Sequence, residues 1–257
     1  MDLSELNLRH LNQINRHPWE LCRLKMLNYF IKHLRKEKIL DVGSGDAYLS
    51  GSLAMQYTSA CIVAVDTNYD EDNIALVNSL KLKNLNLTKD LYQASAILGG
   101  TADVVLLLDV LEHVQRPDLL LKSICSSNTD ENTFFIITVP AYQFLFSEHD
   151  RRLGHVKRYT LKGITNLLEQ NQFEIIHKGY IFNTLVPVRL LQVVWERLFN
   201  SNKIYNKGIH NWKGTPFWTK IIKNYFWIEF KICWYLARLG IYLPGLTCYC
   251  ICRPLPL

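Results

Sequence analysis

The sequence has few features that favour a metal or disulfide framework. Its 257 residues include seven cysteines, an odd number, and none of them forms a Cys-x-x-Cys pair. Cys-x-x-Cys pairs bind many structural zinc ions, and disulfide bonds stabilise small secreted domains. The one cluster, Cys248, Cys250 and Cys252, has a spacing of two, which on a strand places all three side chains on one face. We therefore predict free thiols packed in the core.

Long apolar runs behind a basic cluster are also missing at the start of the chain. Residues 1–16 are polar and of mixed charge, unlike a secretory signal, so we expect a cytoplasmic protein. Internal repeats and low-complexity linkers are absent as well. With 49% hydrophobic and 20% charged residues, the chain can bury an ordinary core, and we expect a single domain over residues 1–257.

Acidic residues are scarce in one segment. Residues 181–243 carry nine Lys or Arg and two Glu, whereas the rest of the chain carries 20 basic and 21 acidic residues. The net charge of +6 therefore belongs to this segment, which also holds five of the six tryptophans.

Hydrophobic periodicity predicts an alternation of strands and helices. Strands are expected at 38–42, 61–65, 104–108, 133–139, 173–180 and 245–252, and helices at 19–34, 47–57, 72–82, 117–126 and 161–171. Strands that alternate with helices of this length imply βαβ units and a doubly wound, mostly parallel sheet in an α/β fold. Residues 181–243 depart from this rhythm and are predicted to be helical.

An apolar strand runs into a glycine turn within residues 39–49. Gly43 and Gly45 let the backbone turn sharply and approach a ligand, because neither has a Cβ. At the carboxyl end of the first strand of a doubly wound fold, such a turn is typical of an adenosine site. Asp41, just before the turn, suits a cationic ligand better than a phosphate.

A second acid, Asp66, ends the next strand, 21 to 23 residues after the two glycines. From that position a carboxylate can accept hydrogen bonds from both ribose hydroxyls. Asp90 follows the apolar Leu85 and Leu87, and can accept from the adenine amino group. A nicotinamide dehydrogenase is the closest competing class, but it needs a glycine three residues after the second one, where this chain has Tyr48.

A further string follows the predicted strand at 104–108, namely Asp109-Val110-Leu111-Glu112-His113-Val114. With the glycine turn and Asp66, it makes residues 17–180 and 245–254 resemble the class I S-adenosylmethionine-dependent methyltransferases. The resemblance implies a Rossmann-like sheet of seven strands in the order 3-2-1-4-5-7-6, with the final strand antiparallel. Residues 181–243 are then a helical insertion before that strand.

The resemblance also implies which residues contact S-adenosylmethionine. These are Gly43, Ser44 and Gly45 at the methionine part, Asp66 at the ribose, Asp90 and Leu91 at the adenine, and Asp109 and Val110 at the sulfonium, with Asp41, Thr67, His113 and Arg23 as further expected contacts. One departure from the family pattern is Asp46-Ala47, where many relatives have a third glycine.

Residues 140–160 hold two histidines, two acids and four basic residues. They are expected beyond the carboxyl edge of the sheet, on the same rim as the cofactor. Their Pro-Ala, Ser-Glu-His-Asp, Leu-Gly-His and Arg-Tyr-Thr pattern resembles a bacterial branch of methyltransferases associated with cell-surface glycan or lipid pathways, as do His17, Trp19 and Arg23. We expect the helix that carries these last three residues to cover the cofactor.

Methyl transfer is an in-line displacement at a sulfonium, so the enzyme has to position an acceptor oxygen or nitrogen and remove its proton. His149 and His155 are the candidate bases, since an unperturbed histidine has a pKa near 6.5 and can be neutral at working pH. Asp150 can orient one of them. The favoured function is methylation of a small or lipid-linked acceptor, at oxygen. The alternative is a cofactor-binding, membrane-associated partner subunit without turnover.

The arginines of the same segment have two interpretations. Arg151, Arg152 and Arg158 can clamp a phosphate or carboxylate of the acceptor, because a guanidinium offers a planar fork of donors. Alternatively, Arg158 pairs with Glu148 or Asp150 and only supports the fold.

A divalent metal ion at Asp109, Glu112 and His113 is a further alternative, because a similar string occurs in ubiquinone-pathway O-methyltransferases. The string also occurs in relatives that are not expected to need a metal, so we predict no metal site.

The segment 181–243 is predicted to dock on a membrane surface without crossing it. Its two long apolar stretches, 181–199 and 217–243, are interrupted by charged residues. On a helical wheel the second stretch places its basic residues opposite an apolar stripe, which comprises Trp218, Ile221, Ile222, Tyr225, Ile232, Leu236 and Leu239. The alternative is a cap in which the same stripe covers the sheet. Binding to nucleic acid is not expected.

Overall fold

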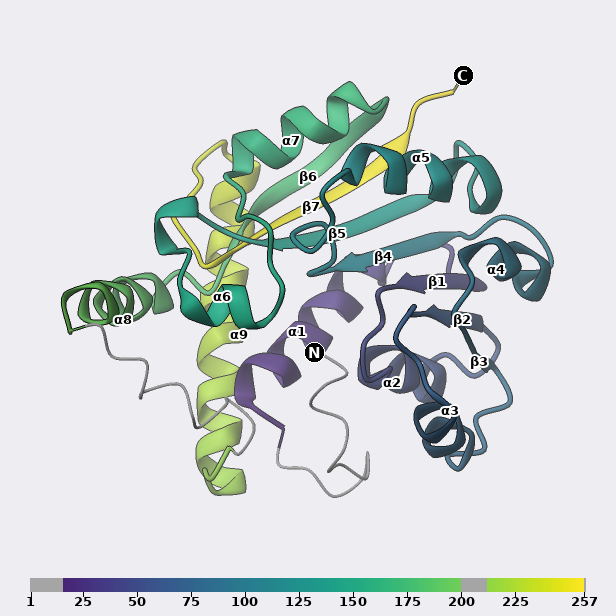
Figure 1. The fold of residues 1–257 in the computed structure, drawn as a ribbon, viewed down its shortest axis with the longest axis horizontal. Coiled ribbons are helices and arrows are strands. Elements are labelled where there is room, and N and C mark those ends of the chain that lie inside the picture. The colour runs from purple at the N-terminus through teal and green to yellow at the C-terminus, as the bar shows by residue number, and fades with distance from the viewer. Residues whose placement is uncertain (1–15, 200–211, 257) are drawn as a thin grey trace.

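The computed structural model describes residues 16–199 and 212–256, which form a three-layer α/β fold (Figure 1). Two parts of the sequence predictions, the polar start up to residue 15 and residues 200–211 of the insertion, lie outside the described residues.

One sheet forms the middle layer, with its strands in the order β3-β2-β1-β4-β5-β7-β6. The strands are β1 (Lys38–Val42), β2 (Cys61–Val65), β3 (Leu85–Thr88), β4 (Val104–Leu108), β5 (Phe134–Pro140), β6 (Phe173–Ile181) and β7 (Thr247–Pro254). Strands β1 to β5 pair in parallel, and β7 runs antiparallel to both β5 and β6. The predicted strand order and the antiparallel last strand are confirmed.

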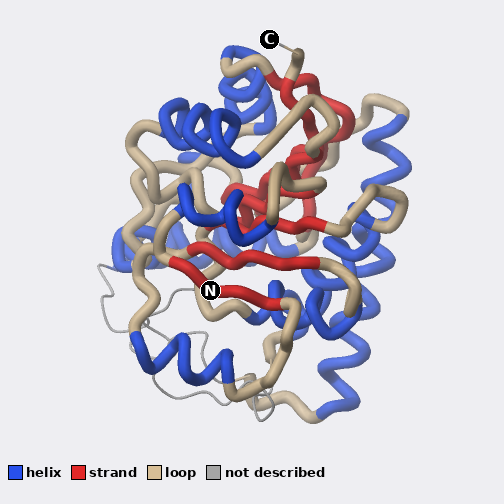
Figure 2. The backbone as a smooth tube through the Cα atoms, turned by 90° about the vertical axis from the view of Figure 1, so that its right-hand side faces the viewer, coloured by secondary structure: helices blue, strands red, loops and turns tan. Residues whose placement is uncertain are grey.

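Helices cover both faces of the sheet, as Figure 2 shows from the side. One face packs against α1 (Pro18–Ile31), α2 (Tyr48–Gln56), α3 (Glu71–Asn78) and α9 (Pro216–Arg238). The other face packs against α4 (Leu91–Leu98), α5 (Pro117–Asn128) and α7 (Leu161–Gln170). The loop after β5 contains a 3₁₀ turn (Gln143–Leu145) and α6 (Glu148–Arg152), and α8 (Leu185–Phe199) projects from the body beside it (Figure 1).

Strand β7 shows how the sequence divides the core between the two faces. Tyr249 and Ile251 belong to the cluster with α1 and α9, whereas Cys248, Cys250 and Cys252 belong to the cluster with α5 and α7. The three thiols are buried and free. The prediction of core cysteines on one strand face is confirmed.

The insertion consists of α8 and α9 within the described residues. Helix α9 packs on α1 and β6, with Phe30 of α1 in ring contact with Phe230 and Trp234. Its buried residues are Phe226, Phe230, Cys233 and Ala237. They are not residues of the predicted stripe, of which Ile222 packs partly buried against the same core cluster. Helix α9 therefore covers this side of the core, as the cap alternative expected, but mainly through a different set of residues.

Candidate active site

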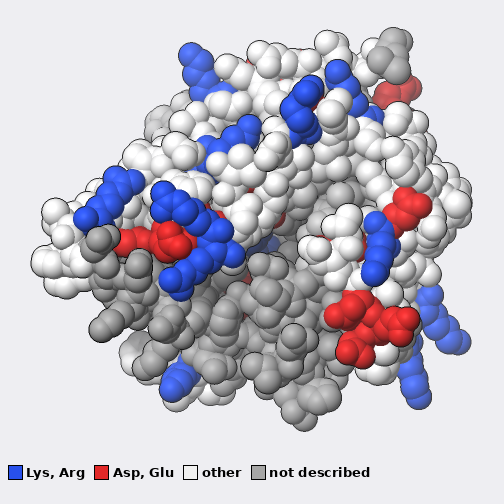
Figure 3. Space-filling model, in the orientation of Figure 1, with Lys and Arg blue, Asp and Glu red and all other residues white. Residues whose placement is uncertain are grey.

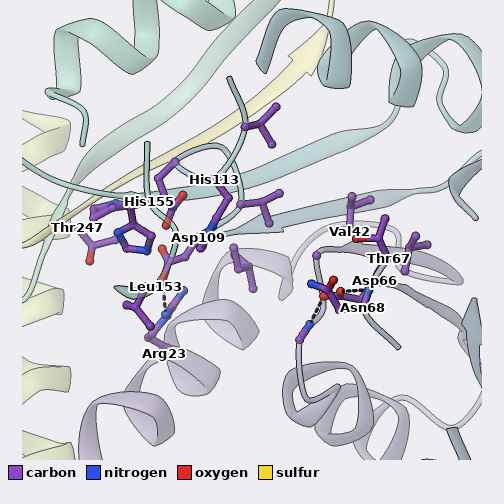
Figure 4. A pocket seen from close by; sticks show the side chains of 18 of the residues that line it. Arg23, Val42, Asp66, Thr67, Asn68, Asp109, His113, Leu153, His155 and Thr247 are labelled. Atoms are coloured by element: carbon purple, nitrogen blue, oxygen red, sulfur yellow. Dashed lines mark hydrogen bonds and ion pairs between the residues drawn. The ribbon is translucent and has the colours of Figure 1, made fainter. Parts of the chain in front are cut away.

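A cavity of about 740 Å³ opens at the carboxyl ends of β1, β2, β4 and β5. This volume is in the range of small-molecule sites. Figure 4 shows its two ends: Asp66, Thr67 and Asn68 lie together at one, and Arg23, Asp109, His113 and His155 lie at the other. Residues of α1, of the loop after β5 and of β7 complete the walls, among them His17, Trp19, Glu20, His149, Leu153 and Thr247.

The glycine turn forms the floor between the two ends. Gly43 and Gly45 have φ angles of 70° and 54°, and the Gly43 and Ser44 amides both donate to the Val65 carbonyl. A Cβ on Gly43 would lie 2.6 Å from Cγ2 of Val110, which also lines the cavity. Any side chain at Gly43 would therefore both strain the turn and fill the floor.

Ala47, at the departure from the family pattern, has a φ of 52° and precedes α2. An L-residue costs about 1–2 kcal/mol in this left-handed conformation. The structure thus keeps the backbone shape that a glycine would adopt, at some cost in stability.

Asp66 is held in place by two backbone amides. Its Oδ2 accepts from Gly45 N at 2.9 Å, and its Oδ1 accepts from Asn68 N at 3.0 Å. Each carboxylate oxygen keeps a further lone pair. Because Asp66 also lines the cavity, the carboxylate fits the predicted contact with two ribose hydroxyls.

Three predicted cofactor contacts do not line the cavity, and their side chains support the fold instead. Asp41 is buried and accepts from the Ser50 hydroxyl, and burial raises the pKa of its carboxyl to about 6. The Ser44 hydroxyl bonds to that of Tyr69 at 2.6 Å. Asp90 caps α4 by accepting from Tyr92 N, while its neighbour Leu91 does line the cavity, as predicted.

Arg23 and Asp109 pair with each other at the end of the cavity away from Asp66. Arg23 reaches from α1 to Asp109 at 2.6 Å and to the Thr138 hydroxyl at 3.1 Å, and that hydroxyl also donates to Asp109 at 2.9 Å. Although burial alone raises it, these partners hold the pKa of Asp109 below its usual value. The φ of Asp109 is 59°, a strained conformation for a residue other than glycine. Helix α1 is thereby tied to the ends of β4 and β5, at the place that the sequence predicted.

The acceptor end contains a buried carboxylate with several partners. The Asp150 side chain is 0% exposed, and it contacts His155 Nδ1 at 2.9 Å and Arg158 at 2.8 and 3.1 Å. Arg189 of α8 approaches the same carboxylate at 3.3 Å. Although burial alone raises it, the bonds from His155 and Arg158 hold the pKa of Asp150 well below its usual range. A carboxylate beside Nδ1 favours the tautomer with a proton there, which leaves Nε2 as the basic nitrogen of His155.

The other catalytic candidates differ in position. His149 lines the cavity, and burial together with Arg189 lowers its pKa. Arg158 does not line the cavity, because its fork is used on Asp150 and on the Ala141 carbonyl. Arg151 and Arg152 pair with Glu148 on the exposed side of α6. None of the three arginines lines the cavity, and the pairing of Arg158 with Asp150 is the alternative that the sequence left open.

Glu112 and two histidines form a group that can hold a metal ion. One donor atom from each of Glu112, His113 and His155 lies within 4.8 Å of the others, and all three residues line the cavity. Glu112 is 0% exposed, neither of its carboxyl oxygens has a hydrogen-bond partner, and burial raises its pKa well above the usual value. Asp109, which the sequence grouped with Glu112 and His113, is bound by Arg23 and Thr138 instead.

Several cavity residues were missed by the sequence analysis. Thr138 does not line the cavity but bonds to Arg23 and Asp109, which do. It could have been found, because it is the one hydroxyl residue in the apolar strand β5. Asn68 follows Asp66 by two residues and supplies an amide to it. Lys89, Leu153, Trp212 and Thr247 come from four different segments, and no spacing in the sequence connects them.

A family model described as "Methyltransferase domain" matches residues 14–178. Because this match covers more than half of the chain, the protein belongs to the methyltransferase domain family. The family and the fold together confirm the prediction of a class I S-adenosylmethionine-dependent methyltransferase. A comparison with curated proteins gives no match.

Solved structures share the fold at low identity. Coclaurine N-methyltransferase, bound to N-methylheliamine and SAH, is 14% identical with a TM-score of 0.56, over 98% of this chain and 78% of that one. A SAM dependent methyltransferase from Archaeoglobus fulgidus is 18% identical with a TM-score of 0.51, over 91% and 93%. The [4+2]-cyclase SpnF is 12% identical with a TM-score of 0.55, over 96% and 85%. Since one fold carries these different activities, the chemistry of this chain has to be argued from its own residues.

Proposed function

We propose that this enzyme transfers the methyl group of S-adenosylmethionine to an oxygen of a small or lipid-linked acceptor. The observation that carries the proposal is the His155 and Asp150 pair at the opposite end of the cavity from Asp66. When bound, S-adenosylmethionine supplies a methyl group activated by a sulfonium. The residues around it have to orient the acceptor, exclude water and take up a proton.

His155 is the proposed base. A hydroxyl acceptor loses its proton on methylation, and a neutral imidazole whose Nδ1 is held by a carboxylate can take that proton at Nε2. Asp150 then stabilises the resulting imidazolium. His149 lies in the same wall and its pKa is lowered, so it stays neutral at pH 7 and is the second candidate base. Both histidines are candidate bases that the sequence analysis named.

Asp66, Gly43 and Gly45 are proposed to hold the cofactor. The carboxylate of Asp66 accepts the ribose hydroxyls, and the glycine floor lets the methionine part pass close to the backbone. Arg23 and Asp109 neutralise each other at 2.6 Å, so the sulfonium meets a pair of near-zero net charge. Leu91 and Thr67 line the end where the adenosine is proposed to lie.

The seven free thiols and the absence of any disulfide in the described residues support a location in the reducing cytoplasm. We propose that the enzyme works there, on acceptors reached from the cytoplasmic side of the membrane.

Calorimetry with S-adenosylmethionine, and with NADH as the competing cofactor, tests the cofactor assignment. We expect S-adenosylmethionine to bind and NADH not to bind; binding of NADH alone would overturn the proposal. The mass of the product after incubation with hydroxyl-bearing, lipid-linked sugars tests the acceptor. Cofactor binding without turnover on any acceptor would favour the partner-subunit alternative.

A further inference from the structure

Helix α8 carries its apolar residues on the outside and its charged residues on the inside. Arg189 contacts Ser147 and Asp150, Glu196 accepts from Glu148 N, and Arg197 donates to the Phe144 carbonyl. The side that faces away from these contacts includes Leu191, Trp195 and Leu198, of which Leu191 and Leu198 are about 70% exposed. This arrangement is the reverse of an ordinary surface helix, whose apolar side faces the core.

Helix α9 is apolar on two opposite sides. Its inner side packs on α1 and β6, whereas its outer side is exposed and includes Trp218, Ile221, Tyr225, Ile228, Ile232 and Leu239. Five of these six residues, all except Ile228, belong to the stripe predicted from the sequence, and Leu239 is the most exposed of them at 75%. We call these exposed residues of α8 and α9 the outer apolar face.

Most of the charged residues on α9 are basic. Lys220, Lys223, Lys231 and Arg238 fall along one flank of α9 between the inner and outer sides, as a helical period of 100° places them. In the described part of the insertion there are two acids, Glu196 and Glu229, and both are tied to the protein, since Glu229 accepts from Thr184 N and Oγ1. Figure 3 shows Lys and Arg around an acidic group over α6 and α8, and a second acidic group on the opposite side over α3.

We propose that the outer apolar face docks the enzyme on an anionic membrane surface. Exposed apolar patches of this extent mark interaction sites in soluble proteins, and tryptophan and tyrosine beside basic residues suit the headgroup zone of a bilayer. No helix in residues 16–199 and 212–256 is long and apolar enough to cross a membrane, so α8 and α9 lie in the interface. A second copy of this chain that docks through the same face is a poorer occupant, because it brings the same cations, and Glu196 and Glu229 of that segment are already hydrogen-bonded.

Docking in this way has a consequence for the acceptor. Helix α8 contacts the segment that carries Asp150, so the acceptor end of the cavity lies beside the docking surface. If the proposed function holds, this position favours an acceptor whose lipid part stays in the bilayer.

Sedimentation with vesicles tests the proposal. We expect the full-length protein to sediment with vesicles of phosphatidylcholine and phosphatidylglycerol at low salt, less at high salt, and little with phosphatidylcholine alone. The double variant Ile221→Glu, Ile228→Glu should lose this binding. Leu119→Glu is the matched control, since Leu119 is an exposed residue of α5 at 53% against 41% and 59% for the other two. It should bind as the wild type does.

Charge variants sharpen the test. Lys220→Gln with Lys223→Gln should weaken vesicle binding about fivefold per charge, and should flatten its salt dependence. Wild-type protein that stays in the supernatant at low salt would overturn the proposal. A dimer in sedimentation velocity that Ile221→Glu dissociates, with no vesicle binding, would overturn it in favour of a second copy. S-adenosylmethionine binding should persist in every variant, which separates failed docking from a failed cofactor site.

Discussion

The two ends of the cavity differ in which atoms shape them, mainly backbone at one end and side chains at the other. At the cofactor end, backbone amides and glycines of β1 and β2 shape the surface, and Asp66 is held by two amides from residues nearby in sequence or space. At the acceptor end, side chains from the loop after α6 and from α8 meet around Asp150 of α6. A site made from backbone is fixed by a short motif, whereas a site made from side chains depends on several segments far apart in the chain. The first should govern affinity and the second turnover.

Replacing the proposed base tests this division most strongly. His155→Ala should lower the methyl-transfer rate by about 10²–10⁴-fold, since the acceptor proton loses its carboxylate-oriented base. The affinity for S-adenosylmethionine should stay unchanged in calorimetry. His33→Ala, at an exposed position after α1, is the control and should leave both quantities unchanged. A near-normal rate for His155→Ala and for His149→Ala would remove histidine as the base.

The buried carboxylate sets the stability of the acceptor end. Asp150→Ala leaves Arg158 and Arg189 without their buried partner, and should lower the free energy of unfolding by about 3–5 kcal/mol at pH 7 in chemical denaturation. Glu148→Ala removes only exposed ion pairs, and should change it far less. An equal effect of the two substitutions would contradict the assignment of Asp150 as the organising group.

The contribution of Asp150 to the free energy of unfolding should depend on pH. Folding depresses the pKa of Asp150, so the carboxylate contributes stability above the unfolded pKa of about 3.9 and loses that contribution as the pH falls toward the folded value. The stability difference between the wild type and Asp150→Ala should therefore be complete at pH 7 and narrow below about pH 4. Denaturation curves across this range measure it, and a constant difference would count against the buried pair.

Substitutions at the cofactor end should lower the affinity for S-adenosylmethionine. Asp66→Ala should weaken S-adenosylmethionine binding by about 1.5–3 kcal/mol, because two charge-assisted hydrogen bonds to the ribose are lost. Asp66→Asn keeps one acceptor oxygen and should weaken S-adenosylmethionine binding less than Asp66→Ala does. Asp72→Ala, at an exposed acid in the first turn of α3, should bind as the wild type does. Calorimetry gives these affinities, and an unchanged value for Asp66→Ala would place the ribose elsewhere.

The smallest effect is expected from removing metal ions. If His155 acts as a base, turnover should be the same before and after treatment with EDTA, and Glu112→Gln, which keeps the size of the side chain, should turn over at a rate near that of the wild type. Loss of turnover with EDTA that Mg²⁺ restores, together with loss in Glu112→Gln, would instead assign Glu112, His113 and His155 to a metal site.

The same contrast explains what the sequence could predict. Six of the seven strands and the glycine turn follow from local periodicity, and the strand order follows from the family resemblance. Strand β3, with four residues, was not predicted. Spacing identified the strand ends that carry Asp41 and Asp66, but it could not tell that Asp41 turns toward Ser50 in α2. Spacing also could not decide whether Arg158 binds the acceptor or pairs with an acid, although the sequence analysis gave both alternatives. The structure shows Arg158 paired with Asp150. Helix α4, with eight residues, is too short for a clear helical period and was missed.

The aromatic contacts between α9 and strand β7 also limit which evolutionary changes this protein can tolerate. Phe230 and Trp234 reach Tyr249 of the strand that follows the insertion, so the segment proposed for docking is part of the same cooperative folding unit as the catalytic sheet. Proteolysis or gene truncation cannot release a smaller enzyme by removing α9, because that would open the core along α1 and β7. If α8 and α9 dock the enzyme as proposed, attachment and catalysis are inherited together, and attachment could be lost only through point substitutions on the outer residues of these helices.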